Sequence, residues 1–169
     1  MPTTAAEAYR TISNHDFASR KQHIVTGQNA LFSLKSFDTG DNISNFYAGS
    51  ISSQPTYLTI QTGFRKHITL EPDFLQYTNH SCSPNVFFDT QHMQLIALKP
   101  IALNDELSFF YPSTEWKMSQ AFSCNCGSPI CLGIIKGAAY LSAETLFRYR
   151  LTGFISSQLA KRAAKIKCA

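Results

Sequence analysis

The chain has 169 residues, of which 44% are hydrophobic and 15% are charged. This length suits one domain, and this composition can bury a core, which excludes a wholly disordered protein. The formal net charge is +4, but the basic excess lies after Glu144, the last acidic residue. We interpret this basic tail as the solvated face of a terminal helix. Because nothing else in the sequence favours nucleic acid, we expect no such partner.

Two kinds of targeting segment are missing from the sequence. No stretch approaches the ~18 consecutive apolar residues that a membrane-spanning helix needs. The first twenty residues carry polar side chains throughout, where a secretory signal would have an apolar centre. We therefore expect a soluble, intracellular protein of the cytoplasm or nucleus, with no membrane partner.

Short segments rich in β-branched and aromatic residues dominate the first two thirds of the chain. They predict strands, in chain order, over 43–51, 56–62, 66–71, 86–89, 93–98 and 106–111. Gly63 favours a hairpin between the second and third of these strands, and Thr90–Gln91 favours another between the fourth and fifth. A short helix is predicted from Pro72 or Asp73 to Gln76 or Tyr77, since proline and an acidic residue suit a first helical turn.

Helical patterns return near the end of the chain. Ser142 is a suitable N-cap for a helix over 143–151, and Gly153 interrupts before a second helix over 154–166. In the second helix Ile155, Leu159, Ala163 and Ile166 follow helical spacing. These helices could pack on the domain or pair two copies as a homodimer. The fold class is therefore α+β and mostly β.

Three of the five cysteines, Cys124, Cys126 and Cys131, lie within eight residues that also contain turn-forming glycine and proline. Zinc takes four thiolates in a tetrahedron, so a fourth ligand must come from elsewhere. Cys82 and Cys168 both remain open on this reasoning. The alternative, disulfides or isolated buried thiols, fits poorly with an odd cysteine count and no export signal. The triplet therefore predicts a zinc site.

Several motifs, taken together and in order, resemble those of SET-domain lysine methyltransferases with a post-SET zinc loop. The segment NHSC at 79–82, with Pro84 and Asn85, looks like the family signature. ELSFFY at 106–111 resembles the E-L-x-F-x-Y strand, and 122–133 resembles the post-SET loop. Tyr47-Ala48-Gly49 resembles a tyrosine-x-glycine element beside the substrate channel. The resemblance covers roughly residues 20–135.

The resemblance implies a SET fold, in which short β-sheets surround a knot-like core. The implied division is an N-terminal segment (1–19), a SET domain (20–112), a post-SET zinc loop (113–135) and a C-terminal helical extension (136–169). It also implies that Cys82 is the fourth ligand beside Cys124, Cys126 and Cys131. Such a Zn²⁺ would be structural, since four thiolates leave no open position for catalysis.

The implied activity is methyl transfer from S-adenosylmethionine to a lysine amine, above all on a protein such as a histone. Tyr111 would be the catalytic tyrosine, and Tyr47 would contribute to catalysis by lining the lysine channel. Without the motifs, both tyrosines would be interpreted as packing residues. Phe88 and Phe109 occupy channel positions that govern the number of methyl groups added. Phenylalanine there leaves room, so we expect a product beyond monomethyl.

Asn79 and His80 would hold the cofactor; the alternative for this pair is that it only satisfies buried backbone groups. Trp116 is placed to stack on the adenine, with core packing as the alternative. Where the family has a Gly-x-Gly turn, this chain has Gln28, Asn29 and Ala30, whose backbone would contact the cofactor. Two other functions compete with protein methylation. One is methylation of a free amino acid or small amine, and the other is a catalytically silent SET module that binds partners.

Overall fold

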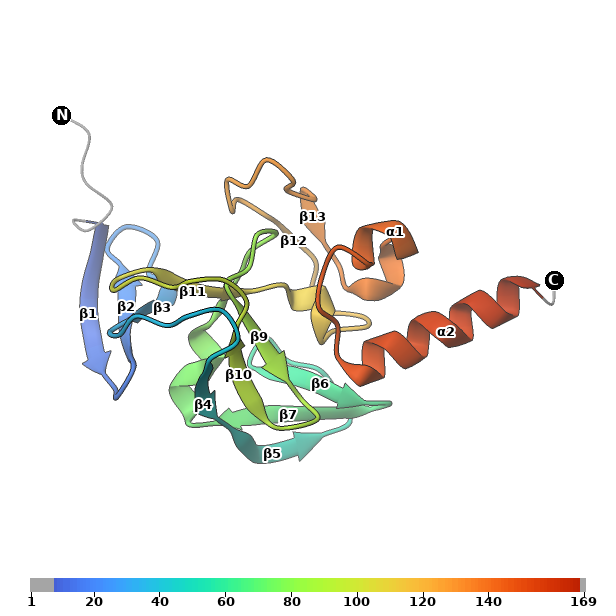
Figure 1. The fold of residues 1–169 in the computed structure, drawn as a ribbon, viewed down its shortest axis with the longest axis horizontal. Helices are drawn as coiled ribbons and strands as arrows, with labels where there is room; N and C mark the ends of the chain where they lie inside the picture. Colours follow the sequence, from blue (N-terminus) through green and yellow to red (C-terminus); the bar gives the residue numbers. More distant parts are fainter. Residues whose placement is uncertain (1–7, 168–169) are drawn as a thin grey trace.

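The structure, a computed structural model, describes residues 8–167 and is built from short strands followed by C-terminal helices (Figure 1). The largest sheet has the order β1-β2-β3-β11-β8. Its strands are β1 (Tyr9–Asn14), β2 (Ala18–His23), β3 (Asn29–Ser33), β8 (Asn79–His80) and β11 (Glu106–Phe109). β8 runs parallel to β11, with Asn79 opposite Ser108 and His80 opposite Phe109. This pairing places the NHSC segment beside the strand that leads to Tyr111.

Strands β1, β2 and β3 have no counterpart in the sequence prediction, which begins its first strand at residue 43. β2 reads ASRKQH and is mostly polar, so its own pattern gives no strand signal. It becomes a strand because it pairs with β1 on one side and β3 on the other. Ala18 and Leu31 from this sheet are buried in the main core.

Two three-stranded sheets complete the SET region. One has the order β4-β10-β9, and the other has the order β5-β7-β6. Their strands are β4 (Asn42–Asn45), β5 (Tyr47–Ser52), β6 (Thr59–Gly63), β7 (Lys66–Glu71), β9 (Val86–Asp89) and β10 (Gln94–Ala97). Both predicted hairpins, β6–β7 and β9–β10, are confirmed.

The single strand predicted over 43–51 is wrong, because the chain leaves one sheet and enters another at Phe46. The Phe46 side chain is only 2% exposed and meets the ring of Phe88 edge-on, with centroids 5.4 Å apart. Burial of this ring turns the chain between β4 and β5. Alternating composition predicts extended backbone but cannot tell which sheet each half joins.

The predicted short helix is present as the 3₁₀-helix η2 (Asp73–Tyr77). The predicted strand 106–111 ends two residues early, at Phe109. Tyr111 instead opens a second 3₁₀-helix, η3 (Tyr111–Ser113), with Pro112 in its first turn. Proline has no N–H to give to a sheet but fits a first helical turn, which accounts for the switch.

The C-terminal part folds around a smaller core of its own. Its elements are β12 (Phe122–Ser123), β13 (Ile134–Ile135), the 3₁₀-helix η4 (Ala138–Tyr140), α1 (Ala143–Leu146) and α2 (Gly153–Lys167). The Ser142 cap is confirmed, since its hydroxyl accepts the N–H of Thr145, but α1 is shorter than predicted. Ile155 and Leu159 are buried, whereas Ile166 is 73% exposed, and α2 extends away from the body (Figure 1). No helix within residues 8–167 is long and apolar enough to cross a membrane.

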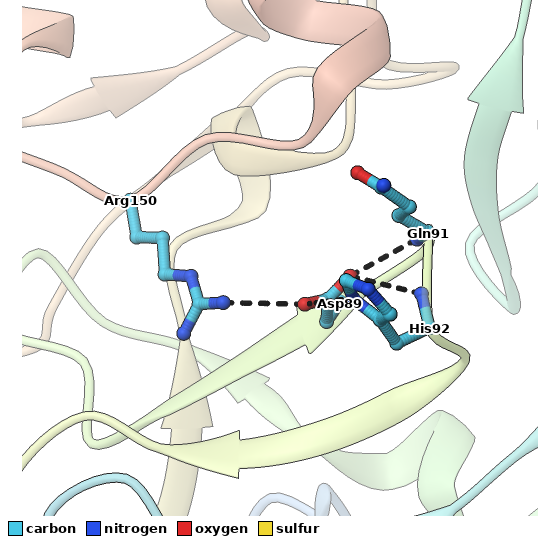
Figure 2. Close-up of polar contacts among 4 residues, drawn as sticks. All are labelled: Asp89, Gln91, His92 and Arg150. Atoms are coloured by element: carbon cyan, nitrogen blue, oxygen red, sulfur yellow. Dashed lines mark hydrogen bonds and ion pairs between the residues drawn. The ribbon is translucent and has the colours of Figure 1, made fainter.

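Contacts from the segment between α1 and α2 tie this part to the SET region. Arg150 donates to Asp89 over 3.2 Å, and the same carboxylate accepts the backbone N–H groups of Gln91 and His92 (Figure 2). Although burial raises the pKa of Asp89, the hydrogen bonds from His92 and Gln91 bring it below its ordinary value. Asp89 is therefore charged at neutral pH and pairs with Arg150.

Candidate active site and metal centre

Four cysteine sulfurs from distant parts of the chain meet beside the SET region. The sulfurs of Cys82, Cys124, Cys126 and Cys131 all lie within 4.8 Å of one another, and those of Cys82 and Cys124 are 4.0 Å apart. Tetrahedral thiolate ligation at about 2.3 Å places sulfurs about 3.8 Å apart. The four-cysteine group could therefore hold a metal ion, and four sulfur donors suit a soft or borderline cation.

Local turns bring the three later cysteines together. β12 pairs with β13, and the N–H of Cys124 donates to the carbonyl of Gly133. Gly127 and Gly133 adopt left-handed backbone conformations, with φ of 69° and 74°, which glycine adopts most readily. Of the two candidates for a fourth ligand, Cys82 lies in the cluster, and Cys168 lies outside the described residues.

Cys82 is buried and is held in place by the loop it joins. The N–H of Leu132 donates to its sulfur over 3.4 Å. Burial raises the pKa of the Cys82 thiol to about 11. A bound cation has the opposite effect, because a coordinating thiol is deprotonated by the charge of the metal. The position of Cys82 therefore suits a metal ligand better than an isolated thiolate.

The NHSC segment is threaded between other parts of the chain by hydrogen bonds. The Asn79 amide donates to the carbonyl of Asn29 and to the carboxylate of Glu106, each over 3.0 Å. The Asn85 side chain bonds β11 twice, donating to the Glu106 carbonyl and accepting the Ser108 N–H, each over 2.8 Å. These bonds, together with the pairing of β8 and β11, hold residues 79–85 beside β11.

His80 links the four-cysteine group to Tyr111. Its Nδ1 accepts the backbone N–H of Tyr111 over 3.2 Å, and its Nε2 lies 3.4 Å from the Cys82 sulfur. Burial lowers the pKa of His80 to about 4, so the imidazole is neutral at neutral pH. A neutral imidazole has one acceptor nitrogen, which its bond to the Tyr111 N–H uses.

The Tyr111 side chain is held by the main core. Its hydroxyl donates to the carbonyl of Thr78 over 3.3 Å, and its ring packs against Phe109 with centroids 4.7 Å apart. Burial, together with the charges of Glu106 and Glu115, raises the pKa of Tyr111 well above its ordinary value. Tyr111 is therefore a neutral phenol at any physiological pH.

Tyr111 lines a cavity of about 460 Å³, which lies within the range typical of small-molecule and cofactor sites. The cavity wall includes five of the predicted site residues: Gln28, Asn29, Asn79, Phe109 and Tyr111. They come from β3, β8, β11 and the chain around them. The fold thus gathers onto one surface residues that are more than eighty positions apart.

The remaining predicted residues lie elsewhere around the site. Ala30 and Phe88 are buried in the core, at 1% and 0% exposed, and Phe88 meets Phe109 edge-on at 4.8 Å. Trp116 packs against the C-terminal core. Tyr47 is 65% exposed on β5, opposite Glu71. Within residues 8–167, neither these four nor His80 belongs to the cavity wall.

Steric crowding explains why the tyrosine-x-glycine element has a glycine at position 49. A Cβ at Gly49 would lie 3.0 Å from Glu71 Cγ and 3.0 Å from Thr69 Oγ1, closer than most real contacts. β5 approaches β7 this closely because the Ser50 N–H donates to the Thr69 hydroxyl. The glycine of the tyrosine-x-glycine element therefore allows β5 to dock.

Sequence reasoning missed part of the cavity wall. Tyr57, Glu115 and the stretch 118–122 line the cavity, yet none was singled out. Glu115 had a visible signal, since it is the one charged residue in the segment PSTEW that follows the predicted strand. Its burial, at 6% exposed, could not be read from composition.

Comparisons with known proteins agree with this arrangement. The SET domain family profile matches residues 5–112. Methyltransferase flvH of Aspergillus flavus is 42% identical over 130 residues, which cover 76% of this chain and 72% of that protein. The H3 lysine-36 specific histone-lysine N-methyltransferase of Saccharomyces cerevisiae is 25% identical over 119 residues, or 66% of this chain and 16% of that protein. The H3 lysine-36 specific enzyme of Schizosaccharomyces pombe is 26% identical over 118 residues, which cover 66% of this chain and 13% of that protein.

The chain thus spans only a small part of the yeast proteins but most of the Aspergillus protein. The family profile covers well over half of the chain, and the matched relatives are named as methyltransferases. A mostly β fold with a threaded NHSC segment and a four-cysteine group accompanies that match. The chain belongs to the SET-domain family, whose members here are methyltransferases.

Proposed function

We propose that this chain transfers methyl groups from S-adenosylmethionine to a lysine amine, in the first place on a protein. The observation that carries the proposal is Tyr111, a partly buried phenol that lines the 460 Å³ cavity together with Asn79. The names of the histone-lysine relatives favour a protein acceptor. The reaction needs alignment and a dry surrounding more than a strong acid or base.

Cofactor binding is assigned to the part of the wall formed by β3 and β8. Gln28, Asn29 and Ala30 would contact it through the backbone, with Asn79 and His80 beside them and Trp116 near the adenine. Asn79 and Asn29 fit this role because they are hydrogen-bonded to each other at the cavity surface. When bound, S-adenosylmethionine supplies a methyl carbon whose bond to positively charged sulfur breaks as an uncharged amine attacks.

The chain's own residues prepare the amine. A lysine amine titrates near 10.4 in water and must lose its proton before it attacks. Apolar surroundings such as Phe109 disfavour the ammonium form and lower that pKa. The Tyr111 hydroxyl would orient the amine and accept weak CH···O contacts from the methyl group. Tyr47 would line the outer part of the lysine channel.

We further propose that the four-cysteine group binds a structural Zn²⁺. The bound ion would join residue 82 to the loop 124–131 and hold the chain from Trp116 to Phe122 against the cavity. We also assign residues 113–135 to a post-SET loop and 136–169 to a C-terminal extension that could pair two copies through α2. The compartment we propose is the cytoplasm or nucleus.

Labelled S-adenosylmethionine separates this function from its alternatives. The chain is incubated with histones, a protein lysate or free lysine, and label is counted in each acceptor. Label in protein lysine supports the proposal, and label only in free lysine or small amines favours the small-amine enzyme. Cofactor binding with no label in any acceptor favours a silent module.

The channel phenylalanines predict the extent of methylation. Phe109 lines the cavity and Phe88 supports it from behind, so neither of these two channel positions carries a hydroxyl. Exhaustive reaction followed by mass spectrometry is expected to show dimethyl or trimethyl product. Phe109→Tyr is expected to shift the product toward monomethyl, because the added hydroxyl occupies space and holds water. Monomethyl product alone from the wild-type chain would contradict this expectation.

A further inference from the structure

Glu115 is a carboxylate fixed in the cavity wall. Its Oε1 accepts the N–H of Gln61 on β6 over 2.7 Å and the hydroxyl of Thr114 over 3.1 Å. The Gln61 side chain in turn accepts the N–H of Trp116 over 3.0 Å. The Glu115 carbonyl accepts the N–H of Ala138 on η4. Bonds on three sides therefore hold this side chain at one place in the wall.

The same carboxylate lacks a positive partner. Among the described residues, no lysine, arginine or histidine lies within ion-pair distance of Glu115, and it is the one charged side chain that lines the cavity. Its hydrogen bonds all go to Oε1. Within residues 8–167, no hydrogen bond reaches Oε2 of Glu115, a residue of the cavity wall.

A buried carboxylate without a counter-charge is unfavourable by itself. Removing an ion from water is costly unless another charge or several hydrogen bonds compensate. Burial raises the pKa of Glu115, and the hydrogen bonds from Gln61 and Thr114 lower it. Burial has the larger effect, so the pKa is raised to about 7. A cation placed in the cavity would remove this penalty, so the wall is electrostatically complementary to a positively charged ligand.

We propose that Glu115 binds the positive charge of the methyl acceptor, an alkylammonium group, as it enters the cavity. The identity of the acceptor as an amine rests on the proposed function. Glu115 is bonded to β6, whereas Asn29 and Asn79, the residues assigned to the cofactor, are bonded to each other between β3 and β8. Capture of the ammonium would precede the proton loss that the transfer requires.

Glu115→Gln tests the proposal with little disturbance of the fold. Glutamine keeps an oxygen that can accept from Gln61 and Thr114, so only the charge is lost. The probe is n-butylammonium, an analogue of the lysine side chain, titrated at pH 8 into metal-loaded protein saturated with S-adenosylhomocysteine. 1-Butanol serves as the uncharged probe. Glu144→Gln is the matched control, since Glu144 is exposed on α1 and is not one of the residues that line the cavity.

We expect the Kd for n-butylammonium to be at least about tenfold higher in Glu115→Gln than in the wild type. This is the change in affinity that follows when a typical hydrogen bond to a charged group is lost. Glu144→Gln should match the wild type, and 1-butanol should not distinguish the proteins. Equal affinities in Glu115→Gln and the wild type would overturn the proposal. It would also be overturned if Glu115→Gln weakened S-adenosylmethionine alone, because the charge would then face the sulfonium.

A pH series adds a second readout. Since the raised pKa of Glu115 means that it gains a proton as pH falls through about 7, wild-type affinity for n-butylammonium should fall between pH 8 and pH 6. Glu115→Gln should show no such fall. The other titratable side chains near Glu115 are the phenols that line the cavity, Tyr57, Tyr77 and Tyr111, and the imidazole of His67 opposite Gln61. Burial raises the pKa of Tyr111 and lowers the pKa of His67, and Arg162 faces the Trp116 ring without pairing with Glu115.

Failure of the proposed function has a different signature. If the wild type binds neither S-adenosylmethionine nor S-adenosylhomocysteine, the methyltransferase assignment fails. The n-butylammonium titration without cofactor then still decides the role of Glu115. An affinity that depends on Glu115 would support the cation site, and its absence would overturn it.

Discussion

Tyr111→Phe is expected to lower the rate of methyl transfer by at least about a hundredfold, a loss typical of removing one group that stabilises a transition state. The hydroxyl is the polar group that Tyr111 presents at the cavity, and phenylalanine cannot replace it. The loss should be the same at every pH between 6 and 9, because burial keeps the wild-type phenol neutral throughout. Label transfer from S-adenosylmethionine measures the rate.

Stability should change little in this variant. The one hydrogen bond lost is the one to the Thr78 carbonyl at 3.3 Å, which costs about 1 kcal/mol. Tyr140→Phe is the matched control, since Tyr140 is 59% exposed on η4 and lies outside the cavity wall. Tyr140→Phe should keep the wild-type rate of methyl transfer. If Tyr111→Phe kept at least half of that rate and so resembled Tyr140→Phe, a catalytic role for Tyr111 would be excluded.

Cys82→Ser is expected to release the bound metal and to destabilise the chain by about 3 kcal/mol or more, since loss of a metal belongs among the largest mutational effects. For a protein of this size each 1 kcal/mol shifts Tm by roughly 2–4 °C, so Tm should fall by about 6–12 °C. Cys82 is fully buried, and its sulfur contacts both the 124–131 loop and His80. Its loss should therefore also weaken cofactor binding.

Metal analysis and thermal unfolding measure these effects. Cys168→Ser is the control, because the family resemblance leaves Cys168 outside the ligand set, and it should retain one metal ion and the wild-type Tm. A strong chelator should reproduce the Cys82→Ser result in the wild type. Full metal content in Cys82→Ser would contradict the ligand assignment.

Local patterns predicted the elements whose register is fixed by nearby residues. The β6–β7 and β9–β10 hairpins, η2 and the Ser142 cap all depend on contacts within about a dozen residues. β2 and the break at Phe46 depend on partners far along the chain, so no window of sequence contains their cause. Pro112 was visible, but its effect, the end of β11 before Tyr111, was not inferred.

The residues of the candidate site also fall into two groups, those that the sequence predicted and those that it did not. Residues carried by motifs, such as Tyr111, Asn79 and Cys82, were predicted because their types and order are unusual. Glu115 belongs to no motif, and its interest comes from burial and from the absence of a cationic partner among the described residues. Both properties exist only once β6 and the segment after η3 are brought together, as they are by the bond from Gln61 to Glu115.

We propose that a metal bound by four cysteines completes a cavity in which cofactor and amine meet beside Tyr111. This is tested by calorimetric titration of S-adenosylmethionine into the metal-loaded chain, before and after chelation. One cofactor is expected to bind per chain and to be displaced by S-adenosylhomocysteine, and binding should be lost when the metal is removed. Folded, metal-loaded protein that binds no cofactor, or binding that is unchanged after the metal is removed, would contradict it.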